Sequence, residues 1–256
     1  MNRNPANSLE HTVSNECIGS IVTGLSVDPS DVILAIGGSG DAAFALLEGA
    51  SRVITVDYNS QQIDYISERM RSLRDSDFDG FLRVSKEGTK DANLGERSFE
   101  KSLERRNRYF RQGKRLEKIR GRLGNLELVK GDIFQVTRDR TGFNKLYLSN
   151  AIGHRLNHDS RKGEQYTETS KVVSQVSQNL PPHGLVYVSD HEELTSLFRF
   201  WSGLPKLSSL ALREDILPPE LKLERELTSR AQKEDRGIWV PAVYIKIQSQ
   251  TASTSQ

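Results

Sequence analysis

Short apolar runs, each stopped by a glycine or a polar cluster, recur along the chain and predict buried strands. The first run covers residues 31–36 (DVILAI) and ends at Gly37, where a turn is predicted. A helical pattern follows from Asp41 (DAAFALLEGA), and a second β-rich run occupies residues 52–57 (RVITVD). We expect another helix over residues 60–73, capped by the serine that begins it. Strand, turn, helix and strand in this order form the parallel crossover unit.

The same alternation of strands and helices continues and ends in a pair of β-like stretches. It predicts an α/β fold, with a doubly wound, mostly parallel, Rossmann-like sheet of about seven strands and an antiparallel edge. We expect residues 1–247 to form one domain and residues 248–256, which are polar and of low complexity, to be disordered. The further strands are expected at residues 126–130, 145–149, 185–189, 221–227 and 238–247, with a long helix at about 164–180.

The gap between the second and third strands is unusually long, at 69 residues from Asp57 to Leu126. An ordinary crossover needs far fewer, so residues 75–122 are interpreted as a helical insertion that could roof a ligand crevice. Within it, residues 97–122 hold eleven Lys or Arg and three Glu, although the net charge of the whole chain is only +2. Such a stripe can meet phosphates, but more often it is the solvated face of a helix. We favour the second interpretation, so nucleic acid is not the expected partner.

The composition predicts a cytoplasmic protein. The sequence contains no run of about 18 apolar residues that could span a bilayer, and residues 1–16 lack the apolar core of a secretory signal. Cys17 is the only cysteine and can form no internal disulfide. Residues 1–20 are polar and could act as a lid over a bound ligand. The aromatic segment 197–201 (LFRFW) fits a core or a dimer surface, so a homodimer is possible.

A glycine-rich turn and a distant acid indicate an adenosine-containing ligand. Gly37, Gly38 and Gly40 follow the first predicted strand and let the backbone approach a ligand closely. Asp57 ends the next strand, 20 residues after Gly37, where a carboxylate can accept hydrogen bonds from the two hydroxyls of a ribose. Tyr58 follows this acid directly.

Two classes of cofactor share this pattern. The segment 38–43 (GSGDAA) satisfies the dinucleotide pattern, in which the helix N-terminus holds a pyrophosphate. Here, however, Asp41 puts negative charge at that place, which suits the ammonium group of a sulfonium cofactor better. After the third strand, Asp132 and Ile133 can receive the amino group and the face of an adenine. The alternative for both acids is that they cap helices.

At these residues the chain resembles class I S-adenosylmethionine (SAM)-dependent enzymes, and more narrowly the betaine-lipid 3-amino-3-carboxypropyl transferase family. The resemblance covers residues 31–155, and its most specific part is Ser149-Asn150 after the fourth strand. The similar blocks are LAIGGSGDAAFALLEGASRVITVDYN, NRYFRQGKRLEKIRGRLGNLELVKGDI and KLYLSNAIGH. This resemblance implies a SAM site that includes Gly37, Gly38, Ser39, Gly40, Asp41, Asp57, Tyr58, Asp132, Ile133, Ser149 and Asn150.

The resemblance also implies an unusual reaction of SAM as a substrate. Members of the family break the bond between the γ-carbon and the sulfur and release methylthioadenosine, and related azetidine-2-carboxylate synthases cyclise SAM on itself. For cyclisation the amine of SAM must be held unprotonated near its own γ-carbon. Asn150, after the fourth strand, and Tyr187, on the fifth, offer neutral oxygens for this catalytic role. Alternatively, Asn150 is a turn residue and Tyr187 a core aromatic.

The sequence leaves several other functions open. An ordinary methyltransferase that releases S-adenosylhomocysteine is the main alternative, followed by a nucleic-acid-binding module and an NAD-dependent dehydrogenase. His154 and His158 have the spacing of metal ligands on one helical face, but no regularly spaced third ligand follows, and we expect no metal. The chain lacks a G-x-S-x-G elbow and a phosphate-binding P-loop, which argues against a hydrolase or a kinase.

Overall fold

The protein is described from a computed structural model. The structure describes residues 8–85, 89, 96–152, 165–191, 214, 217–234 and 239–248. The predicted tail beyond residue 248, the histidine pair at 154 and 158, and the aromatic segment 197–201 lie outside the described residues.

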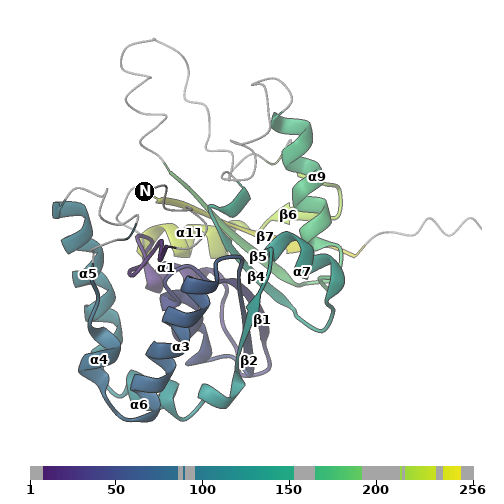
Figure 1. The fold of residues 1–256 in the computed structure, drawn as a ribbon. Helices are drawn as coiled ribbons and strands as arrows, with labels where there is room; N and C mark the ends of the chain where they lie inside the picture. The colour runs from purple at the N-terminus through teal and green to yellow at the C-terminus, as the bar shows by residue number, and fades with distance from the viewer. Residues whose placement is uncertain are drawn as a thin grey trace, which may run out of the picture.

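A seven-stranded sheet runs through the molecule in the order β3-β2-β1-β4-β5-β7-β6 (Figure 1). The strands β3, β2, β1, β4 and β5 run parallel to one another, and β7 runs antiparallel to both β5 and β6. This arrangement is the class I SAM-dependent methyltransferase fold, and the predicted sheet is confirmed. The strands are β1 (Val32–Ile36), β2 (Arg52–Asp57), β3 (Leu126–Lys130), β4 (Lys145–Ser149), β5 (Leu185–His191), β6 (Leu221–Leu223) and β7 (Trp239–Lys246).

Helices cover both faces of the sheet. In Figure 1, α1, α3 and α11 lie on one side of the strands, and α7 and α9 lie on the other. Two buried apolar clusters follow this division, because alternate residues of each strand point to opposite faces. The helices are α1 (Ile18–Gly24), α2 (Asp41–Leu47), α3 (Ser60–Arg74), α4 (Phe78–Leu82), α5 (Glu96–Phe110), α6 (Arg115–Arg120), η3 (Leu123–Asn125), α7 (Ile133–Asp139), α9 (Gln165–Ser177) and α11 (Arg225–Glu234).

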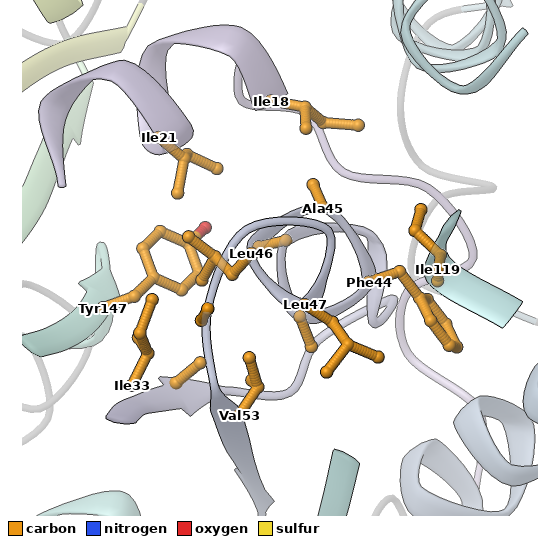
Figure 2. Packing of buried hydrophobic residues seen from close by; sticks show 14 of the residues in the cluster. Ile18, Ile21, Ile33, Phe44, Ala45, Leu46, Leu47, Val53, Ile119 and Tyr147 are labelled. Carbon is orange, nitrogen blue, oxygen red and sulfur yellow. The ribbon is translucent and has the colours of Figure 1, made fainter. Parts of the chain in front are cut away.

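Helix α2, which directly follows the glycine turn, is buried on every side. Figure 2 shows Ile18 and Ile21 of α1 on one side of this helix, and Phe44 pointing from it towards Ile119 of α6. The sequence DAAFALL suits this position, since all residues after Asp41 are small or apolar. A helix packed from all sides holds its N-terminus, and with it the turn before it, in one place.

The segment interpreted as an insertion contains the helices α4, α5 and α6, between α3 and β3. It is bound to the core by aromatic packing: the ring of Phe81 lies edge-on to Phe44 at 5.0 Å and to Phe110 at 5.2 Å. Several of its cations bind within the molecule. Arg115 pairs with Glu48, the C-cap residue of α2, at 2.6 Å, and Arg106 is buried. The basic stripe is therefore partly structural.

Two local predictions are wrong. The cap of α3 is Asn59, whose side chain accepts from the Gln61 N–H at 3.0 Å, and Ser60 is already the first helical residue. The predicted strand 221–227 ends at Leu223, because Glu224 caps a new helix and its carboxylate accepts from the Leu227 N–H at 2.5 Å. Apolar residues at 221, 223 and 227 match a strand and a helix alike, and only the cap decides between them.

Candidate functional site

The glycine turn lies between the ends of β1 and β2. The Gly37 N–H donates to the carbonyl of Val56 at 2.7 Å, so the turn begins in contact with the neighbouring strand. A Cβ atom on Gly37 would lie 2.9 Å from the Cβ of Asp57, which is too close for any other residue. Gly38 has a φ of +50°, a conformation that favours glycine. These two positions explain why the turn needs glycine.

Asp57 is joined to this turn by hydrogen bonds. Its Oδ2 accepts from the Gly38 N–H and its Oδ1 from the Asn59 N–H, both at 2.9 Å. Burial raises the pKa of Asp57, and the two N–H donors act in the opposite direction. Each carboxylate oxygen has a further lone pair, and the side chain is 8% exposed, so the acid is oriented and can accept from two hydroxyls of a ligand.

Asp41 is the centre of a buried ion network. Its Oδ1 accepts from Arg69 at 2.7 Å and from Arg106 at 2.9 Å, and its Oδ2 accepts from the Ser39 hydroxyl at 3.0 Å and the Ser14 N–H at 2.8 Å. Arg69 also donates to the carbonyl of Ser39 at 2.6 Å. The carboxylate thus connects the glycine turn with α3, the insertion and the N-terminal segment.

This network contains more positive than negative charge, because two guanidinium groups surround one carboxylate. Burial would raise the pKa of Asp41, but Arg106 and Arg69 outweigh it and hold the pKa at about 2. The ring of Phe81 stacks under Arg69 at 4.3 Å. In this structure Asp41 and Ser39 hold the turn together. A contact between Asp41 and the substrate ammonium stays a prediction.

A stretch of the N-terminal segment, residues 8–17, crosses the same edge of the sheet, and we call it the strap. It begins beside Asn59 after β2, passes Asp41 after β1 and ends near β4. Its polar residues form no periodic pattern, so the sequence could suggest a lid but not its path. The strap is bound through Ser8 to Asn59 (2.8 Å), Glu10 and His11 to Gln62 (3.2 and 3.1 Å), Thr12 to Tyr65 (3.1 Å) and Asn15 to Arg105 (3.0 Å).

Tyr58 projects from the end of β2 and is 62% exposed. Its hydroxyl donates to Glu10 of the strap at 3.0 Å. Partial burial, the hydrogen bond to Glu10 and the charges of Glu10 and Asp57 raise the pKa of Tyr58 to about 12. The phenol therefore stays protonated at neutral pH and keeps its bond to the strap. An exposed ring next to Asp57 is free to cover part of a nucleoside.

Asp132 and Ile133 lie where β3 passes into α7. Asp132 caps this helix, and its carboxylate accepts from the Phe134 N–H at 2.9 Å. The capping alternative is therefore present in the structure. Ile133 is 5% exposed and belongs to the cluster under α7 and α9. Contacts of either residue with an adenine remain predictions.

The end of β4 brings together residues far apart in the sequence. Ser149 has a φ of +53°, which is uncommon for a residue other than glycine and typical of strained functional turns. Its hydroxyl donates to Glu16 of the strap and lies 3.4 Å from Oδ1 of Asn150. The hydroxyl of Tyr147 donates to the same Glu16 oxygen at 3.2 Å. Glu16 is 4% exposed, and sequence reasoning missed it because nothing near it forms a motif.

Tyr187 lies inside the protein and is fully buried. Strand register pairs it with Tyr147, three residues before Asn150. Its hydroxyl is 3.1 Å from that of Ser20, and its ring fits because Gly24 has no side chain: a Cβ there would lie 2.8 Å from the ring. The surroundings of Tyr187 are therefore those of a core aromatic residue, which was the alternative interpretation of this position. The prediction that Tyr187 and Asn150 together hold an amine is untested.

Two further observations concern metals and membranes. Among the side chains that the structure describes, no group of three His, Cys, Asp or Glu could hold a metal ion. In the same part of the chain, no helix combines the length and the apolar character needed to cross a membrane.

No protein-family model and no curated protein matches the chain. Solved structures with a similar course of the chain include TrmN from Thermus thermophilus, with 13% identity and a TM-score of 0.49 over 96% of this chain and 52% of that one. A putative methyltransferase from Escherichia coli, yhhF, has 12% identity and a TM-score of 0.46 over 90% and 85%. The N-methyltransferase NodS from Bradyrhizobium japonicum has 12% and 0.43 over 90% and 93%. These likenesses show neither the reaction nor the substrate of this chain, and the strand order alone establishes its fold.

Proposed function

We propose that this protein is a SAM-dependent enzyme that breaks the Cγ–S bond of SAM and releases methylthioadenosine. The other product is azetidine-2-carboxylate, if the amine of SAM attacks its own γ-carbon, or a small amine that carries the 3-amino-3-carboxypropyl group. The observation that carries the SAM site is the pair of bonds from Gly38 and Asn59 to Asp57. They hold a carboxylate at the carboxyl end of β2, where folds of this kind bind ligands, and this supports the binding of a ribose.

The cyclisation can be written with all atoms inside SAM. The amine nitrogen forms a bond to Cγ, the Cγ–S bond breaks, and its electron pair passes to the sulfur, which becomes a neutral thioether. The attacking amine has to be unprotonated, so one proton of the ammonium form is released in each turnover. The protein needs to hold a strained conformation and to accept a proton, and it supplies no reacting atom.

Two observations support chemistry at the γ-carbon. The first is the resemblance of the Ser149-Asn150 block to the aminocarboxypropyl transferase family, and the second is the position of the strap. The strap is bonded to groups at the ends of β2, β1 and β4, so it covers the edge at which SAM would bind. Covering this edge restrains the amino-acid chain of SAM and keeps water from competing with the amine. Asn150 at the end of β4 is our candidate for holding the amine, with Tyr187 as a second neutral group deeper in the sheet.

Methyl transfer with release of S-adenosylhomocysteine is the second candidate, because the fold is that of class I methyltransferases. The products distinguish the two. Purified protein incubated with SAM alone should release methylthioadenosine and azetidine-2-carboxylate, identified by mass spectrometry. Methylthioadenosine that forms only when a small amine is added would support transfer and exclude cyclisation. Formation of S-adenosylhomocysteine with a methylated acceptor would overturn the proposal.

A further inference from the structure

Glu16 occupies a distinctive place in the candidate site. It belongs to the strap, two residues before α1, and yet it reaches the carboxyl end of β4 in the middle of the sheet. The side chain is 4% exposed. A glutamate is rarely buried to this degree without a specific reason, because removing its charge from water costs several kcal/mol unless other groups compensate.

Two hydroxyls orient this carboxylate. Those of Tyr147 and Ser149 both donate to its Oε1. Burial and the nearby charge of Glu16 raise the pKa of Tyr147 well above its usual value, so the phenol remains a donor. Hydroxyl donors fix the direction of a carboxylate without cancelling its charge. Asp41, in contrast, is held by two guanidinium groups and serves the fold.

Glu16 and Asp57 lie at the ends of the two strands that flank β1 in the sheet. Asp57 ends β2, the glycine turn follows β1, and Glu16 sits at the end of β4, which neighbours β1 on its other side. A nucleoside whose ribose binds Asp57 and whose 5′ substituent lies over the glycine turn would extend this substituent towards β4. In SAM this substituent is the sulfonium and the amino-acid chain, which ends in an ammonium and a carboxylate.

We infer that Glu16 is the group that recognises the α-ammonium of the substrate, and that the strap carries the specificity for the amino-acid end of SAM. The inference rests on the nucleoside site of the proposed function but not on its reaction. For chemistry at the γ-carbon, the same carboxylate can take the proton that the ammonium releases: an N–H bond breaks, an O–H bond forms on Glu16, and the nitrogen lone pair becomes free to attack. Asn150 then holds the neutral amine.

The test compares three ligands by calorimetry: SAM, S-adenosylhomocysteine and methylthioadenosine. The second lacks the sulfonium but keeps the amino-acid end, and the third keeps only the nucleoside and its thioether. Glu16→Gln preserves the shape and an acceptor for both hydroxyls while removing the charge. We expect it to weaken binding of SAM and S-adenosylhomocysteine about ten- to a hundredfold, the range for losing a hydrogen bond to a charged group, and that of methylthioadenosine less than about threefold.

Two variants make the result specific. Glu10→Gln removes another carboxylate of the strap and should leave the affinity ratio of S-adenosylhomocysteine to methylthioadenosine unchanged. If Glu16→Gln fails to fold, Tyr147→Phe serves in its place, since it removes one donor to the carboxylate and should lower the same ratio less strongly. Equal losses for all three ligands, or no loss, in a folded variant would overturn the inference.

Failure of the nucleoside site would be recognised separately. Asp57→Ala should weaken all three ligands by a similar factor. If it changes none of them, the proposed SAM site itself is wrong. If it weakens all three while Glu16→Gln and Tyr147→Phe leave the affinity ratio as it is, the site stands and only the role of Glu16 is refuted.

Discussion

The Nε atom of Arg106 lies 2.9 Å from Oδ1 of Asp41, so the basic insertion holds the residue that follows the glycine turn. The same guanidinium donates to the carbonyls of Phe81 and Leu82 at 2.9 and 2.8 Å, which satisfies it on three sides. The insertion is therefore a support for the candidate site.

Loss of this contact should destabilise the fold strongly. Arg106→Met keeps much of the side-chain volume but leaves a carboxylate short of one cation and two carbonyls without their donor. We expect the free energy of unfolding to fall by about 3 to 5 kcal/mol, as for other broken buried pairs, measured by urea denaturation. Arg108→Met is the matched control: its pair with Glu104 is exposed and should contribute less than about 1 kcal/mol. Equal effects of the two variants would contradict the structural role of Arg106.

The low pKa of Asp41 predicts a specific pH dependence of the stability of the fold. The folded-state pKa is about 2, below the ordinary 3.8, so the carboxylate adds stability that is fully present above about pH 4 and is lost as the pH falls towards 2. The shift corresponds to about 2 kcal/mol. Asp41→Asn should therefore be less stable than the wild type at pH 7, and the difference should shrink between about pH 4 and pH 2. Denaturation at a series of pH values measures it, and a difference independent of pH would exclude the ionised form.

Substitution of Gly37 and substitution of Asp57 should both weaken the binding of SAM. A Cβ on residue 37 would lie 3.0 Å from Oδ2 of Asp57, so Gly37→Ala should displace the carboxylate from its bond to Gly38. We expect SAM affinity to fall in Gly37→Ala and, by about 1.5 to 3 kcal/mol, in Asp57→Ala, measured by calorimetry. Gly124→Ala is the control, because a Cβ there meets no atom within 4 Å. Unchanged affinity in folded Asp57→Ala would remove this residue from the site.

Asn150 and Tyr187 should affect turnover more than binding. If they hold the attacking amine, Asn150→Ala and Tyr187→Phe should lower the rate of methylthioadenosine release about ten- to a thousandfold, or about 1.4 to 4 kcal/mol of barrier. The affinity for SAM should change much less, since the nucleoside is bound elsewhere. Asn125→Ala, at the far end of β3, should leave both quantities unchanged. Full activity of both site variants would refute the assignment, whatever the product.

The sequence by itself determined the sheet and the proximity of the glycine turn to Asp57. Residues 32–36 and 52–57 are short runs rich in apolar and β-branched residues, and the first is followed directly by glycine. A buried parallel strand needs little more to be recognised. The distance from Gly37 to Asp57 follows from one crossover unit, so local chain geometry brings them together. The structure confirms this with the contact between Gly38 and Asp57.

Only the tertiary structure decided the surroundings of Glu16, Asp41 and Arg106. Their contacts span 133 residues from Glu16 to Ser149 and 65 from Asp41 to Arg106, and no periodic pattern links such distant polar positions. The free energy of a buried ion pair or carboxylate depends on the groups that surround it after folding. These groups have to replace the water that solvates the same side chain in the unfolded chain. The sequence indicated an acid at the start of α2 and a basic insertion; packing made them one network and placed Glu16 at β4.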